Sequence, residues 1–136
     1  ELALADGDWA TAMASVAGGR AGARSETVIA AQAAVQAGRP AEAVQRLQTW
    51  VTLHPGDATA WQLLANASQA MGQTLRALRA EAEAQVAMLD YGAAMDRFRA
   101  AQALARQPGA DHFEASIIDT RARQVESLLR EQALER

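Results

Sequence analysis

The stretch GRPAEAVQRLQTWVTLHPGDATAWQLLANASQAMGQ, residues 38–73, decides the fold of this chain. Its two ends are glycine-containing turns, because Gly38 and Gly72 stand 34 residues apart, and Pro55 interrupts it halfway. Glycine adopts the left-handed conformation that ends a helix, and proline cannot continue a helix. Asp57, two residues after the proline, carries a side chain that caps the start of a helix. The stretch therefore predicts a helical unit that repeats every 34 residues.

The composition of the whole chain favours an all-α fold in one domain. The chain has 136 residues, of which half are apolar and only 4% aromatic, and much of its apolar content is alanine, the best helix former. The net charge of −3 is small, so nothing indicates a nucleic-acid partner. There is no cysteine, and no apolar run reaches the length of a membrane span. We expect no membrane insertion.

The residues around the two glycines resemble the tetratricopeptide repeat (TPR), a 34-residue helix–turn–helix unit. The best copy has its consensus residues at Trp61, Leu64, Ala65, Gly72 and Ala77. The copy before it has Gly38, Ala43, Leu47 and Pro55, with Thr27 at the tryptophan position. The resemblance implies a TPR-like α–α superhelix, or solenoid, in which stacked helix pairs bind other proteins.

The same signals predict about seven helices in a single domain, 1–136. We expect the helices near 8–18, 24–37, 40–53, 58–71, 74–89, 92–106 and 111–133. The repeat-like units lie near 1–23, 24–57, 58–89 and 75–107, followed by a capping helix at 111–133. Two units overlap, because the turn at Leu89 follows Gly72 by 17 residues, half a repeat. The helix between these turns is expected to close one repeat and open the next.

The last helix is expected to cap the array. Asp111 and Glu114 have the spacing of a capping-box variant. An apolar stripe at helical spacing comprises Phe113, Ile117, Val125, Leu128 and Leu129. Among the tryptophans, Trp9, Trp50 and Trp61 are expected to pack between helices, and Trp50, which replaces a small alanine, to be the most exposed.

Residues for catalysis or metal binding are few. His54 and His112 are the only histidines, and neither has a second histidine or cysteine at ligand spacing. The chain has no HExxH motif, and the glycine-rich GGRAG at 18–22 lacks the flanking residues of a phosphate-binding loop. We therefore expect no catalytic residue, no cofactor and no metal in this chain.

Binding is the remaining function, and the TPR resemblance implies where it occurs. The first helix of each repeat lines a concave groove, in which an extended peptide or a helix of a partner lies. The predicted groove residues are Gln32, Val35, Thr59, Gln62, Asn66, Gln69, Arg76, Arg79 and Glu83, and the same pattern includes Ser25, Val28 and Val86. The amides suit main-chain hydrogen bonds, and Arg76 and Arg79 suit a carboxylate. The alternative is that these residues form an ordinary solvated face.

The last sixty residues resemble, more specifically, the C-terminal domain of the BepA-type periplasmic zinc metallopeptidases. The matching residues are Asp111, Phe113, Ser116, Ile118 and Arg121, and the half-repeat step is part of that pattern. The resemblance implies a periplasmic domain that docks substrates and contacts the outer-membrane assembly machinery, while a separate HExxH domain hydrolyses. Because the chain opens at Glu1 without an initiator methionine or a signal-peptide pattern, we expect it to be a fragment of a longer protein.

Two alternatives stay open at this point. The first is a stand-alone TPR scaffold or adaptor with no protease attached. The second is a fragment that self-associates through an apolar surface around Leu2, Leu4 and Trp9.

Overall fold

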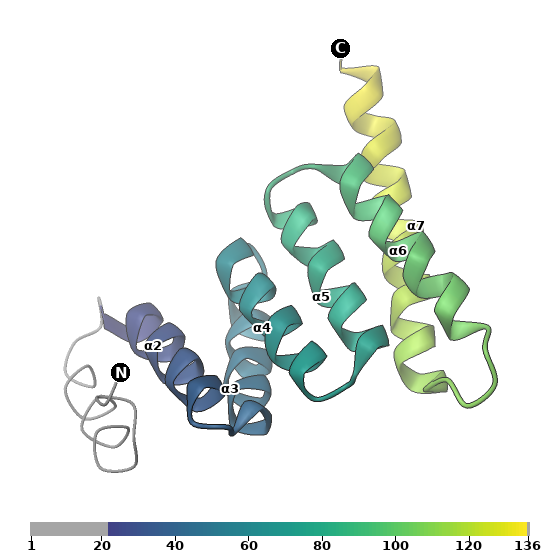
Figure 1. Ribbon diagram of the computed structural model, residues 1–136. Helices are drawn as coiled ribbons and strands as arrows, with labels where there is room; N and C mark the ends of the chain where they lie inside the picture. Colours follow the sequence, from purple (N-terminus) through teal and green to yellow (C-terminus); the bar gives the residue numbers. More distant parts are fainter. Residues whose placement is uncertain (1–21, 136) are drawn as a thin grey trace.

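The computed structural model describes residues 22–135, which form six helices stacked side by side in chain order (Figure 1). The helices are α2 (Ala23–Gln36), α3 (Pro40–Leu53), α4 (Ala58–Ala70), α5 (Thr74–Ala87), α6 (Tyr91–Ala105) and α7 (His112–Leu134). Their bounds confirm the predicted ones to within two residues, and the described residues contain no strand. The expected helix near 8–18, with Leu2, Leu4 and Trp9, lies outside the described residues.

Three of the turns share one backbone motif. Gly38, Gly72 and Leu89 have φ of 78°, 73° and 62°. At each turn, the amide of this residue donates to the carbonyl three residues back, and the next amide donates to the carbonyl five residues before it, at distances from 2.7 to 3.0 Å. These two bonds satisfy the free carbonyls at the end of a helix in a Schellman motif. The glycine spacing therefore identified these turns correctly, and the half-repeat step at Leu89 uses the same geometry.

Leu89 is a non-glycine residue in the left-handed region, and its side chain is 64% exposed. A Cβ in this conformation crowds the following carbonyl, at a cost of about 1–2 kcal/mol. Replacing Leu89 with glycine is therefore expected to raise the free energy of unfolding by about 0.5–1 kcal/mol, because the relieved strain exceeds the added chain entropy of glycine. Urea unfolding measures this difference.

The control for this prediction is Gly72→Ala, which places a Cβ in the same conformation and should destabilise by about 1 kcal/mol. A Leu89→Gly variant less stable than the wild type would show that the leucine side chain contributes more than its backbone strain costs.

The other two connections have a different form. Pro55, Gly56 and Asp57 join α3 to α4, and Pro108, Gly109, Ala110 and Asp111 join α6 to α7. Asp57 caps α4 by accepting from the Ala60 amide at 3.1 Å. Asp111 caps α7 by accepting from the amides of Phe113 and Glu114 at 2.9 and 3.2 Å. A proline followed by an aspartate N-cap thus marks these two connections, whereas the left-handed motif marks the other three.

The order of the two turn types gives α5 two roles. α5 follows a left-handed turn, as α3 does, and also precedes one, as α2 does. The contacts between helices agree, because α2 contacts α4 and α5 contacts α7, whereas no such contact joins α3 to α5 or α4 to α6. The described helices therefore form two units of the same topology, α2–α3–α4 and α5–α6–α7. We call these the first unit and the second unit.

Each unit has its own apolar core. Leu47 and Phe98 are equivalent, because each is fully buried and follows the left-handed turn residue of its unit by nine residues. Leu47 packs with Trp61 and Leu64, and Phe98 packs with Ile118 and Val125. Alanines fill the remaining close contacts in both clusters, and they allow the helices to approach. These cores fix the positions of the side chains on the surface between α2 and α4.

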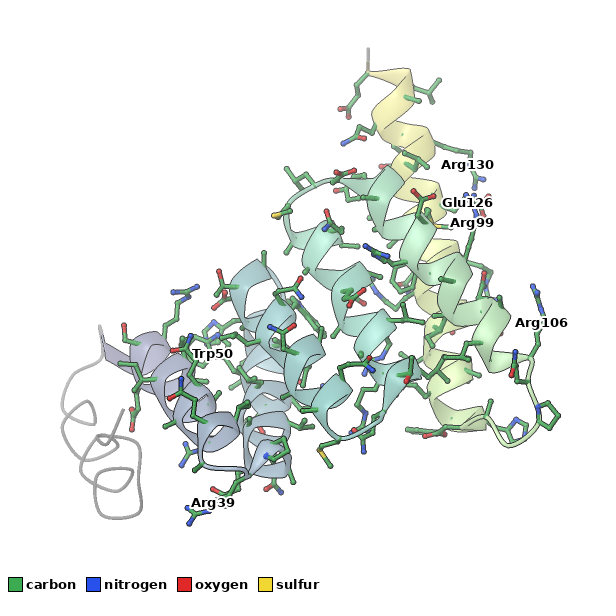
Figure 2. The ribbon with its side chains drawn as sticks, viewed as in Figure 1. Arg39, Trp50, Arg99, Arg106, Glu126 and Arg130 are labelled. Atoms are coloured by element: carbon green, nitrogen blue, oxygen red, sulfur yellow. The ribbon has the colours of Figure 1, made fainter. Side chains whose placement is uncertain are left out.

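Asp57 connects the three helices of the first unit. Besides capping α4, its carboxylate accepts from Arg24 of α2 at 2.7 and 3.0 Å and from the Trp50 indole of α3 at 2.9 Å. Trp50 is half-buried by this contact and stacks on His54, with ring centroids 3.9 Å apart, whereas Trp61 is buried. Figure 2 shows Trp50 at the place where α2 and α3 meet. The predicted packing of Trp50 and Trp61, with Trp50 the more exposed, is confirmed.

The carboxylate of Asp57 gives the protein an acid-sensitive contact. The hydrogen bond from Arg24 is the main cause that lowers the pKa of Asp57 from 3.8 to about 2, against the opposing effect of burial. The lowered pKa stabilises the fold above pH ~4, and this stabilisation is lost as the pH falls from ~4 to ~2. Because Arg24 is half exposed and solvent screens the pair, we expect the loss to be about 1 kcal/mol.

Urea unfolding at several pH values would measure this loss. The control is Asp57→Asn, which keeps a capping side chain and has no proton to gain. A wild-type protein whose stability falls with acid no more than that of Asp57→Asn would contradict the assignment to Asp57.

Candidate protein-binding groove

A groove of about 430 Å³ lies between α2 and α4, with Leu47 of α3 at its base. Its walls combine apolar and amide side chains: Ile29, Gln32, Val35 and Gln36 from α2, and Leu63 and Asn66 from α4. None of the residues that line it is charged. Ile29 and Val35 are 36% and 39% exposed, so apolar surface remains accessible in the groove.

Three of the nine predicted groove residues line this groove: Gln32, Val35 and Asn66. Thr59, Gln62 and Gln69 are exposed on α4 without lining it, although the Gln62 side chain donates to Asn66 Oδ1 at 3.3 Å. The sequence pattern missed Ile29 and Leu63, each of which directly follows a position that the pattern assigns to the concave face. A consensus position fixes the helix face only to about one residue, and the apolar type of these neighbours was the available signal.

The three predicted residues of α5 lie elsewhere, in contact with α7. Arg79 forms an ion pair with Glu114, and both side chains are buried. Arg76 Nε is 4.0 Å from the second oxygen of Glu114. Arg76 and Arg79 therefore do bind a carboxylate, as their type suggests, but α7 of the same chain supplies it.

Glu83 is likewise paired within the chain. Its carboxylate accepts two hydrogen bonds from Arg121, at 2.6 and 2.8 Å, and Glu83 is only 7% exposed. This bidentate geometry is the strong form of an arginine–carboxylate contact. The structure therefore corrects the predicted placement of Arg76, Arg79 and Glu83 in a groove accessible to a partner, because α7 occupies that side of α5.

Two expectations for α7 are also corrected. Asp111 caps the helix, but Glu114 does not complete a capping box, because its carboxylate pairs with Arg79. Phe113 lies beside the capping turn and is 79% exposed, so the apolar stripe begins one turn later, with Ile118, Ala122 and Val125. Figure 2 shows Arg99, Glu126 and Arg130 on the side of α6 and α7 that faces away from α5. A charged outer face of this kind suits the last helix of an array.

Equivalent positions explain why the two units differ. Counting from the left-handed turns and from the two capping aspartates, Val28 and Gln32 of α2 correspond to Arg79 and Glu83 of α5. Ala60 and Ala67 of α4 correspond to Glu114 and Arg121 of α7. Ion pairs therefore span the space between the outer helices of the second unit. In the first unit the corresponding residues are uncharged, and the accessible groove lies there.

Other kinds of site have little support in the part of the chain that the structure describes. Residues 22–135 contain no group of three or more histidine, cysteine, aspartate or glutamate side chains placed to hold a metal ion. None of the six described helices combines the length and the apolar character that crossing a bilayer requires.

Comparison with known proteins gives one match. Residues 24–67 match the family model of the tetratricopeptide repeat, and this segment covers α2, α3 and most of α4. No curated protein matches the chain. The helices that match are those that form the groove. The described residues are thus an all-α, TPR-like superhelix whose first unit is a tetratricopeptide repeat segment.

Proposed function

We propose that this chain is a protein-interaction domain that holds an extended segment of a partner protein in the groove between α2 and α4. The observation that carries the proposal is the coincidence of the accessible apolar groove with the tetratricopeptide repeat match. Such repeats generally bind proteins or peptides through this kind of surface.

The chemistry of the groove supports binding of a polypeptide. Its apolar walls release water when they are covered, at about 25 cal/mol per Å² of apolar surface. Gln32 and Asn66 stand on opposite walls, and their amides are able to donate to carbonyls and accept from N–H groups of an extended main chain. Ile29 and Val35 are the exposed apolar side chains of α2 that would be buried in the complex.

The test is a selection of peptides from a random display library on the wild-type protein, followed by affinity measurements on two variants. Val35→Arg places a charge in the groove, and Leu53→Arg places the same charge on α3, outside it. The selected peptides should lose about tenfold or more in affinity for Val35→Arg, and none for Leu53→Arg. Selected peptides that bind both variants as tightly as the wild type would rule out the groove as the binding site.

We propose further that the domain is the docking part of a periplasmic zinc metallopeptidase that acts in outer-membrane protein quality control. The support is the sequence resemblance in α7 alone. Three of its residues also have roles in the cap itself: Asp111 caps α7, Ile118 is buried and Arg121 pairs with Glu83. Reading the coding sequence upstream of Glu1 tests this proposal. An HExxH segment with a signal peptide would support it, whereas a gene without them would leave a stand-alone adaptor.

A further inference from the structure

We infer that the groove selects an uncharged extended segment that inserts one aliphatic side chain between α2 and α4 and hydrogen-bonds through its main chain to Gln32 and Asn66. This inference rests on the proposed function and adds the chemical class of the ligand.

The width of the groove favours an extended ligand over a helical one. Cα atoms of α2 and α4 come within 8 Å of each other, whereas a partner helix with its side chains is about 10–12 Å across. A helix therefore rests on the rim, while an extended chain inserts every second side chain into the groove. Ile29, Val35 and Leu63 form the apolar walls around such a side chain, and Leu47 lies beneath it.

The absence of charge among the lining residues excludes a charged side chain at this point. A carboxylate or an ammonium group placed there would lose water without gaining a partner. The second unit shows what the chain does when a charge occupies the corresponding place, because Glu83 there accepts two hydrogen bonds from Arg121. In the first unit Gln32 stands at the position of Glu83, so the groove has a neutral amide where the closed surface has a carboxylate.

The two amides determine what the ligand backbone has to supply. Gln32 is exposed, and its side chain has no hydrogen-bond partner within residues 22–135. Asn66 accepts from Gln62 and keeps its own amide protons for a ligand. Covering these groups without satisfying them is unfavourable, so the ligand offers both a carbonyl and an N–H group. A main chain provides both, one on each side of the inserted residue.

The experiment uses four acetylated and amidated heptapeptides of serine and asparagine that differ only at the central residue: leucine, serine, aspartate or lysine. The readout is the side-chain amide NMR signals of Gln32 and Asn66 in the full chain. The leucine peptide should shift both signals with one saturable binding curve. The serine, aspartate and lysine peptides should bind about tenfold or more weakly. Raising NaCl from about 50 to about 500 mM should change the affinity for the leucine peptide by less than about twofold.

The outcomes separate the ligand class from the proposed function. An aspartate or lysine peptide that binds more tightly than the leucine peptide, with salt-dependent affinity lost in Val35→Arg, would overturn the ligand class and keep the groove as the binding site. Signals of Gln32 and Asn66 that respond to none of the four peptides would overturn both proposals.

Two other occupants have their own signatures. An affinity for the leucine peptide that falls as the protein concentration rises would assign the groove to a second copy of the chain. An affinity that increases in the full-length Leu4→Ser variant would assign it to the chain's own first residues. Either result would overturn the inference.

Discussion

Replacing Glu114 with alanine is expected to lower the free energy of unfolding by about 3–5 kcal/mol, because it leaves the guanidinium of Arg79 buried without its carboxylate. Arg79 is only 8% exposed, so water compensates little of this loss. Urea unfolding followed by far-UV circular dichroism measures the change.

A double variant distinguishes the lost partner from a lost contact. Arg79→Met combined with Glu114→Leu removes both charges and keeps apolar volume, and its stability should lie within about 1 kcal/mol of the wild type. The matched surface control is Glu126→Ala, whose partner Arg130 is 3.8 Å away and exposed, and it should cost less than about 0.5 kcal/mol. A Glu114→Ala variant no less stable than Glu126→Ala would contradict the role assigned to the buried pair.

Replacing Phe98 with alanine is expected to cost about 3–5 kcal/mol, because the side chain is fully buried at the centre of the second unit. Helices in the described array contact only helices near them in the chain, so the loss is expected to act on α5–α6–α7 first. Two probes resolve this. All three tryptophans precede residue 62, so their fluorescence reports on the first part of the chain, while circular dichroism reports on all helices.

In Phe98→Ala the circular dichroism transition should therefore begin at a lower urea concentration than the fluorescence transition. The matched control is Leu47→Ala, at the equivalent position of the first unit, in which the fluorescence transition should come first. Transitions that coincide in both variants would show that the array unfolds as one cooperative unit.

The sequence predicted the helices well because their ends are written in local chemistry. Glycine in a left-handed turn, proline after a helix and aspartate at an N-cap act within a few residues, and each was visible in the residue pattern. Leu89 was identified from spacing alone, since its residue type gives no turn signal, and this spacing is what indicated the double role of α5.

The groove was predicted only in part, because it depends on which helix covers which. Gln32, Val35 and Asn66 follow from the repeat pattern alone. The pattern does not show that α7 would cover α5, since the partners Arg79–Glu114 and Glu83–Arg121 are 35 and 38 residues apart. Complementary charges at such a separation become informative only once the path of α7 is known.

The double role of α5 also determines how this array can be shortened by protein engineering. Removal of one ordinary repeat, α4 with α5, would join α3 directly to α6, two helices that each follow a left-handed turn. Removal of residues 58–111 would instead join Asp57 to His112, so that one capping aspartate replaces the other and α7 takes the place of α4 behind α3. The natural increment of this solenoid is therefore three helices, and a designer who cuts or extends it in pairs would bring mismatched faces together.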